Sequence, residues 1–202
     1  MKLYKFKDYS DYVRTQKKAN KKKRRHVWAG EKEIIAIVDY IKSHIPNASF
    51  GICHGVRTGW EVKKFRNLLG IEVIGTEIGE ISHSYVIRWD FNKVKPEWIG
   101  MVDFIYSNSF DHTYAPDKCL KQWMKCLNIN GLCFLEWAEA HDSKFDACDC
   151  FAASMDEYRK MIEKEYDIMD EILIMCYGYS WKDEARKEHP RTIFVIKNRK
   201  NE

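Results

Sequence analysis

Residues 49–77, SFGICHGVRTGWEVKKFRNLLGIEVIGTE, predict a strand, a glycine-bearing turn, a helix and a second strand. The apolar runs at 49–53 and 71–75 suit buried parallel strands, and apolar side chains recur at helical spacing between them. In open α/β sheets the crevice outside the carboxyl ends of the strands binds ligands. Because a carboxylate placed there can accept both hydroxyls of a ribose, we expect a nucleoside-containing molecule to lie across Gly55, Gly59 and Glu77.

The size and composition of the chain indicate one globular domain. Its 202 residues suffice for one full core, and 45% of them are hydrophobic and 32% charged. No apolar run approaches the roughly 18 residues that span a bilayer, and the amino-terminal residues MKLYKFKDYSDY lack the hydrophobic core of a signal peptide. We therefore expect a cytoplasmic protein.

The seven cysteines are scattered, mostly within apolar segments, which indicates free thiols in a reducing compartment. Cys148 and Cys150, with His141 nearby in sequence, form only a weak metal-binding pattern, because no second pair stands at matching spacing. A structural role is the preferred interpretation, and we expect no metal site.

Positive charge is concentrated near the amino terminus. Seven of the nine residues from Lys17 to Arg25 are Lys or Arg, although the net charge of the whole chain is only +4. Such a cluster can bind the phosphates of a nucleic acid. The solvated side of a helix is the preferred interpretation, since base-stacking aromatic residues are not interleaved with the run.

Strands and helices alternate along most of the chain, which predicts a Rossmann-like three-layer α/β sandwich with a mostly parallel seven-stranded sheet. Residues 1–48 are expected to form helices that pack on or cap the sheet, and residues 49–202 the core of the same domain. Beyond the opening unit, strands are expected at residues 86–89, 102–107, 132–137, 168–176 and 192–197, and helices at residues 9–28, 31–44, 116–127 and 154–166.

Three connections are distinctive. Residues 78–85 form a tight crossover with room for one or two helical turns. Asn130 and Gly131 predict a turn into the fifth strand. A loop over residues 178–191 predicts that the last two strands pair antiparallel at one edge of the sheet.

Four segments resemble, by their order and spacing, the class I S-adenosylmethionine-dependent methyltransferases, in particular the small enzymes of methyltransferase type 11. These segments are GICHGVRTG, VIGTEI, WDF and DFIYSNSFDHTYAPDKCLKQWMKCLNINGLCFLEW, and they extend from about Ser49 to Glu136. The resemblance implies a seven-stranded sheet, a bound S-adenosylmethionine and transfer of its methyl group to an acceptor. A small molecule, a sugar and a peptide remain equal candidates for that acceptor.

The resemblance also implies which residues bind the cofactor. The acidic-x-Gly-x-Gly-x-Gly turn of the family falls on residues 53–59, with Cys53 in place of the acidic residue and Arg57 in place of the middle glycine. The Arg57 guanidinium can instead pair with the carboxylate of the cofactor. The implied cofactor-binding residues are His54, Gly55, Arg57, Thr58, Gly59, Glu77, Ile78, Asp90, Phe91, Ser107, Asn108 and Ser109.

Within this set, the resemblance assigns Glu77 to the ribose and Asp90 to the adenine amino group, with Phe91 beside it. Residues 107–109 would lie against the methionine portion and the transferred methyl. Simpler interpretations are a tight turn for the glycines, a surface carboxylate for Glu77 and a turn residue for Asp90.

His112 is the residue best placed by sequence to touch both cofactor and substrate, and a histidine near neutrality can take a proton from an attacking hydroxyl or amine. A structural histidine that caps the next helix is an equal alternative. Glu136, with Glu139 and His141 beyond it, is a candidate wall of the acceptor pocket. A dedicated base is optional, because alignment in a water-poor pocket supplies much of the rate of methyl transfer.

Two further functions are compatible with such a sheet. A nicotinamide dehydrogenase fits poorly, because the strict G-x-G-x-x-G pattern is absent. The second alternative function is that of a catalytically silent nucleotide- or RNA-binding module with the same fold. Arg57 in the glycine turn and the basic run from Lys17 to Arg25 motivate it.

Overall fold

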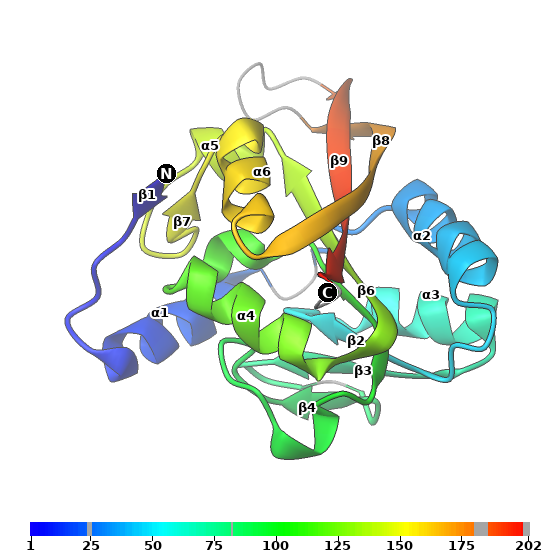
Figure 1. Ribbon diagram of the computed structural model, residues 1–202. Helices are drawn as coiled ribbons and strands as arrows, with labels where there is room; N and C mark the ends of the chain where they lie inside the picture. The colour runs from blue at the N-terminus through cyan, green and yellow to red at the C-terminus, as the bar shows by residue number, and fades with distance from the viewer. Residues whose placement is uncertain (24–25, 82, 180–185, 200–202) are drawn as a thin grey trace.

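A seven-stranded sheet forms the centre of the computed structural model, which describes residues 1–23, 26–81, 83–179 and 186–199 (Figure 1). In spatial order its strands are β4 (Val86–Arg88), β3 (Glu72–Glu77), β2 (Phe50–His54), β5 (Val102–Ser107), β6 (Leu127–Ala138), β9 (Arg186–Asn198) and β8 (Tyr166–Tyr179). The first five strands are parallel to one another. The mostly parallel seven-stranded sheet expected from the sequence is confirmed.

The last two strands form the antiparallel pair expected at one edge. β9 runs antiparallel to both β6 and β8, and it therefore lies one place in from the edge that β8 forms. The expected loop over residues 178–191 was too long, because the strands extend to Tyr179 and from Arg186. Residues 180–185 lie outside the described part of the chain.

Helices cover both faces of the sheet (Figure 1). Those that carry the two outer layers are α2 (Glu31–His44) and α3 (Trp60–Leu69) on one face, and α4 (Pro116–Cys126) and α6 (Met155–Glu163) on the other. Side chains of β5 alternate between the layers, as a strand buried on both faces requires. Phe104 and Tyr106 pack in the cluster with α2 and α3, whereas Ile105 packs in the cluster with α4 and α6.

The amino-terminal helix α1 (Tyr9–Lys22) lies apart from these layers. It begins at Asp8, whose side chain accepts a hydrogen bond from the backbone N–H of Asp11 at 2.8 Å. Its buried residues Tyr12 and Gln16 reach loops beyond the strand ends: Tyr12 Oη donates to the carbonyl of His112 at 3.2 Å, and Gln16 Nε2 to that of Cys148 at 2.8 Å. The helix therefore covers the carboxyl edge of the sheet.

Several local expectations were wrong. The helix expected over residues 9–28 ends at Lys22, and no helix occurs among the described residues of the connection 78–85. Asn130 and Gly131 lie within the bounds of β6, in an irregular stretch between the pairs Val102–Leu127 and Phe104–Leu132, and pairing with β5 resumes at Leu132, where the strand was expected to begin. Unexpected elements are a two-stranded sheet of β1 (Lys2–Leu3) and β7 (Phe151–Ala152), the short helix α5 (Ala140–Ser143), and the 3-10 turns η1 (Pro96–Trp98) and η2 (Phe110–His112).

None of the helices in the described ranges combines the length and the apolar character that crossing a membrane requires.

Candidate functional site

A cavity of about 480 Å³, counted to its open mouth, lies between α1 and the carboxyl ends of the parallel strands. The α1 side is formed by Tyr12, Gln16, Ala19, Asn20 and Lys23. The loops after the strands contribute Gly55, Arg57, Glu77, Ile78, Asp90, Phe91, Ser109, His112 and Cys148. Residues from all four segments of the family resemblance therefore meet in one place.

The turn after β2 needs glycine at two points. Gly55 and Gly59 have φ values of +74° and +69°, and a Cβ on Gly55 would come within 2.7 Å of the Ser109 Cβ. Arg57 is the exception, since it holds φ at +40° although it carries a side chain. Its backbone N–H donates to Oε2 of Glu77 at 2.9 Å, which ties the turn to the end of β3.

Glu77 is 5% exposed and forms one wall of the cavity. Its other oxygen, Oε1, accepts the backbone N–H of Gly79 at 2.8 Å. The carboxylate is thus fixed in orientation, and each oxygen retains a further acceptor position for a ligand hydroxyl.

Asp90 and Phe91 close the far end of the cavity, after β4. Asp90 Oδ2 accepts the hydroxyl of Tyr9 at 2.9 Å, and Oδ1 accepts the backbone N–H of Asn92 at 2.9 Å. The carbonyl of Phe91 accepts Nε1–H of Trp123 at 2.8 Å, which anchors this loop to the core.

Some expected site residues support the loops and do not face this cavity. His54 is buried with Nδ1 2.8 Å from Thr76 Oγ1 and its ring stacked on Trp123, and burial lowers its pKa to about 3, so the ring is neutral. Ser107 Oγ donates to the carbonyl of His54 at 3.1 Å and accepts the N–H of Ser109 at 3.1 Å. The side chains of His54 and Ser107 therefore hold the strand ends together.

Thr58, Gly59 and Asn108 also lie outside the large cavity. Thr58 Oγ1 accepts the N–H of Trp60 at 3.3 Å, and Gly59 is the N-cap of α3. Thr58 and Asn108 line a second, smaller cavity that adjoins the first.

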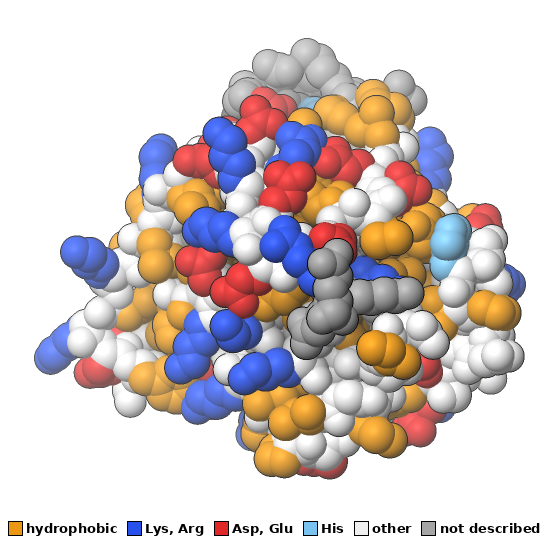
Figure 2. Space-filling model, viewed as in Figure 1, with side chains coloured by type: hydrophobic (Ala, Val, Ile, Leu, Met, Phe, Trp, Pro, Cys, Tyr) orange, Lys and Arg blue, Asp and Glu red, His pale blue; other side chains and the backbone are white. Residues whose placement is uncertain are grey.

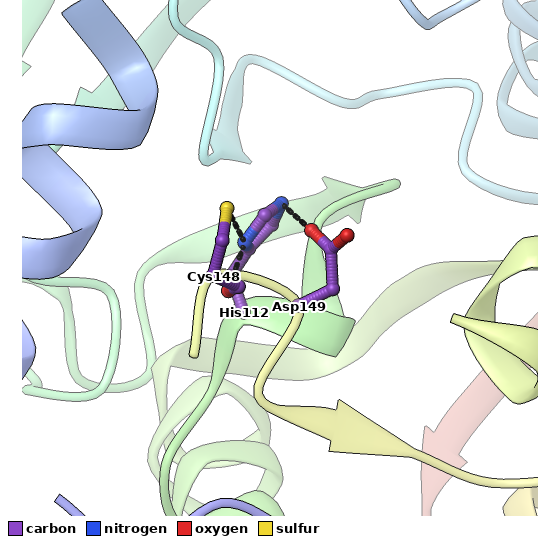
Figure 3. Close-up of side chains that lie close together, drawn as sticks. All are labelled: His112, Cys148 and Asp149. Carbon is purple, nitrogen blue, oxygen red and sulfur yellow. Dashed lines mark hydrogen bonds and ion pairs between the residues drawn. The ribbon is translucent and has the colours of Figure 1, made fainter. Parts of the chain in front are cut away.

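His112 lies between Cys148 and Asp149 (Figure 3). Its Nδ1 is 2.8 Å from the carbonyl of Cys148, to which it donates, and 3.8 Å from Sγ of the same residue. Its Nε2 is 3.7 Å from Asp149 Oδ1 and 3.9 Å from Asp111 Oδ1. Burial alone lowers the pKa of His112, but these acceptors outweigh it and raise the pKa to about 10.

The expected proton-accepting role of His112 conflicts with this charge state. At neutral pH the ring already carries both protons, and an imidazolium has no free lone pair. His112 can donate hydrogen bonds and supply positive charge at the cavity wall.

The imidazole, thiol and carboxylate of His112, Cys148 and Asp149 are ligand types that a metal ion takes, and they lie within 4.8 Å of one another. Lys23 Nζ, however, lies 3.7 Å from both Cys148 Sγ and Asp149 Oδ1, and Lys144 forms an ion pair with Asp149. An added cation would have to displace these ammonium groups.

The weak metal pattern noted in the sequence does not assemble as a group. Cys150 Sγ donates to the carbonyl of Thr113 at 3.2 Å, and His141 stacks on Tyr158. Only Cys148 of that pattern belongs to the cluster with His112.

Glu136 was a candidate wall of the acceptor pocket, but it lines neither cavity. It is buried and accepts the hydroxyl of Tyr106 at 2.7 Å and Nη1–H of Arg191 at 2.5 Å. Sequence reasoning missed Glu61, which lines the smaller cavity, and the side of α1 that carries Gln16. The one signal available in the sequence for the α1 side was the group of apolar residues Tyr9, Tyr12 and Val13 in the expected helix.

No protein-family model matches the chain, and no curated protein matches it. Solved structures do match. The 1,6-didemethyltoxoflavin-N1-methyltransferase of Burkholderia thailandensis, with its substrate and S-adenosylhomocysteine bound, has a TM-score of 0.72 at 12% identity, over 97% of this chain and 93% of its own.

Two further matches have a TM-score of 0.64. The geranyl diphosphate C-methyltransferase of Streptomyces coelicolor, solved with Mg²⁺, geranyl diphosphate and S-adenosylhomocysteine, is 10% identical over 93% of this chain and 98% of its own. An N-methyltransferase of Haemonchus contortus, with phosphomonomethylethanolamine and S-adenosylhomocysteine bound, is 11% identical over 96% of this chain and 61% of its own. At these identities the likeness shows the fold, which is that of the class I methyltransferases.

Proposed function

We propose that this protein transfers the methyl group of S-adenosylmethionine to a small-molecule acceptor. One observation carries the proposal: Gly55, Glu77 and Asp90, which follow three neighbouring strands, line a single cavity. The presence of S-adenosylhomocysteine in three solved proteins of the same fold supports the choice of ligand. Those proteins act on different acceptors, one of them at carbon, so the fold leaves the acceptor open.

In this proposal each part of the cofactor meets a different loop. Glu77 accepts the ribose hydroxyls, since its oxygens are already oriented by Arg57 and Gly79. Asp90 accepts the adenine amino group, and Ile78 and Phe91 give apolar walls to the base. The turn at residues 55–59, together with residues 107–109, holds the methionine portion.

Bound S-adenosylmethionine supplies an electrophilic methyl group, and the protein has to align the acceptor with it and exclude water. α1 contributes the exclusion, because Tyr12 and Gln16 hold it over the strand ends through His112 and Cys148. His112 keeps its proton and donates Nδ1–H to the carbonyl of Cys148, so it fixes this wall of the cavity. A proton released by an N–H or O–H acceptor then leaves to solvent.

Isothermal titration calorimetry with S-adenosylmethionine, NAD and a short single-stranded RNA tests the proposal. We expect saturable binding of S-adenosylmethionine that Asp90→Ala weakens at least tenfold. Glu72→Gln, an exposed change at the opposite end of β3, should leave binding unchanged. Tight RNA binding without binding of S-adenosylmethionine would contradict the proposal and favour the nucleotide- or RNA-binding module.

The surface gives limited support to the nucleic-acid alternative. Lys17, Lys18, Lys21 and Lys22 are exposed, but Lys23 points to Cys148 and Asp149 at the cavity. On the face shown in Figure 2, basic and acidic side chains are mixed over the upper part, and several basic side chains gather toward the lower left.

A further inference from the structure

The second, smaller cavity, which we call the end chamber, adjoins the large cavity over the glycine turn. It shares Gly55, Arg57 and Ser109 with the large cavity. Its other walls are residues 26–28 between α1 and α2, the start of α3, and Asn108. The two cavities therefore adjoin each other at the glycine turn.

Glu61 supplies a buried carboxyl group to the end chamber. It is 6% exposed and belongs to the first turn of α3. The Glu61 carboxyl accepts a hydrogen bond from its own backbone N–H, and within the described ranges no ion pair involves it. Burial raises the pKa of Glu61 to about 8, with Glu77 and Glu136 adding to the effect and Arg57 opposing it. Ionisation of this buried carboxyl costs stability, and a ligand that donates to it or carries positive charge removes that cost.

Arg57 supplies a positive charge. Its backbone is in the left-handed region that favours glycine, so the turn retains a side chain there at a conformational cost. Its Nε is buried without a hydrogen-bond partner, and Nη1 donates to the carbonyl of His26 at 3.3 Å. The positive charge of Arg57 lowers the pKa of Glu61, although no hydrogen bond or ion pair joins the two side chains.

A buried carboxyl and a guanidinium that line one chamber without pairing match the two ends of a zwitterion, whose ammonium group favours the ionised form of the carboxyl. We propose that the Glu61 carboxylate binds the α-ammonium group, and the Arg57 guanidinium the carboxylate, of the amino-acid end of S-adenosylmethionine. A guanidinium can grip a carboxylate through two parallel N–H donors, which also fixes its orientation. The inference rests on the proposed function and adds a selectivity to it: the site distinguishes the intact cofactor from adenosyl thioethers that lack the amino acid.

Calorimetry with three probes separates the two contacts. S-Adenosylmethionine carries both groups, decarboxylated S-adenosylmethionine lacks the carboxylate, and 5′-methylthioadenosine lacks the whole amino-acid end. Glu61→Gln should lose at least tenfold in affinity for the first two probes and bind methylthioadenosine as the wild type does. Arg57→Gly should lose at least tenfold for S-adenosylmethionine alone.

Both variants should fold, because one replaces a buried carboxyl by an amide of similar size and the other places glycine at a positive φ. Glu72→Gln makes the same chemical change at an exposed carboxylate and should bind all three probes normally. Unchanged binding of S-adenosylmethionine by Glu61→Gln, or an equal loss for all three probes in either variant, overturns the inference. A wild-type protein that binds none of the probes instead refutes the proposed function.

Discussion

Replacing Glu61 by Gln should stabilise the free protein, and the gain should increase with pH. Burial raises the pKa of Glu61 in the folded protein to about 8 from an ordinary value of 4.5. Below pH 4.5 the carboxyl is protonated in both the folded and the unfolded state. Between pH 4.5 and 8 the unfolded chain gives up this proton first, so the free energy of unfolding falls as pH rises. Glutamine does not ionise in this range, so the variant lacks this pH-dependent loss of stability.

The two pKa values of Glu61 set the magnitude. Each pKa unit corresponds to about 1.4 kcal/mol, so the interval from 4.5 to 8 amounts to at most about 5 kcal/mol above pH 8. Water that enters the end chamber lowers the cost of the charge, and we therefore expect a gain of about 2 to 5 kcal/mol at pH 9 that vanishes near pH 4.5.

Urea unfolding of the wild type, Glu61→Gln and Glu72→Gln at pH 5, 6, 7, 8 and 9 measures this effect. The difference between Glu61→Gln and the wild type should widen with pH, whereas Glu72→Gln should stay parallel to the wild type. A constant difference across the pH range would refute the reasoning. Saturating S-adenosylmethionine should stabilise the wild type more as pH rises, because a bound ammonium group compensates the ionised carboxylate.

Other changes have distinct expected results. Glu77→Ala should weaken binding of S-adenosylmethionine by about 1 to 3 kcal/mol in calorimetry through lost charge-assisted hydrogen bonds, and unchanged affinity would remove this residue from the site. His112→Asn should lower stability below pH 6.5, where the ion pairs of the histidine are complete, and the deficit in thermal melts should shrink as pH approaches 10, at which the folded ring loses its proton. Gly55→Ala should destabilise the protein more than Gly70→Ala in the same melts. Both glycines have φ near +70°, but only at Gly55 would the new Cβ meet a neighbour, Ser109.

The sequence predicted the elements whose patterns are local. α2 was expected over residues 31–44, and the structure has it there, because its apolar side chains recur at helical spacing and Pro46 follows its end. The convergence of Gly55, Glu77 and Asp90 was also predictable, since parallel strands bring their carboxyl ends to one edge.

Features that depend on distant contacts were not predictable. Asn130 and Gly131 usually mark a turn, but pairing with β5 on both sides of this irregular stretch keeps them within the bounds of β6. The sequence did not indicate that Glu61 lines a cavity, because acidic residues are common in the first turn of a helix and are usually exposed there. The charge state of His112 depends on Cys148 and Asp149, more than thirty residues away in sequence.

The position of β9 has a consequence for how the protein is made. β9 follows every other strand in sequence, yet it lies between β6 and β8. Until residues 186–198 leave the ribosome, β6 has one unpaired side and β8 has no strand to join. All residues of the two cavities precede residue 149 and are synthesised earlier. A message truncated ahead of β9 would therefore yield a chain with every residue that lines the two cavities, an open edge on β6 and an unpaired β8, and open strand edges favour aggregation.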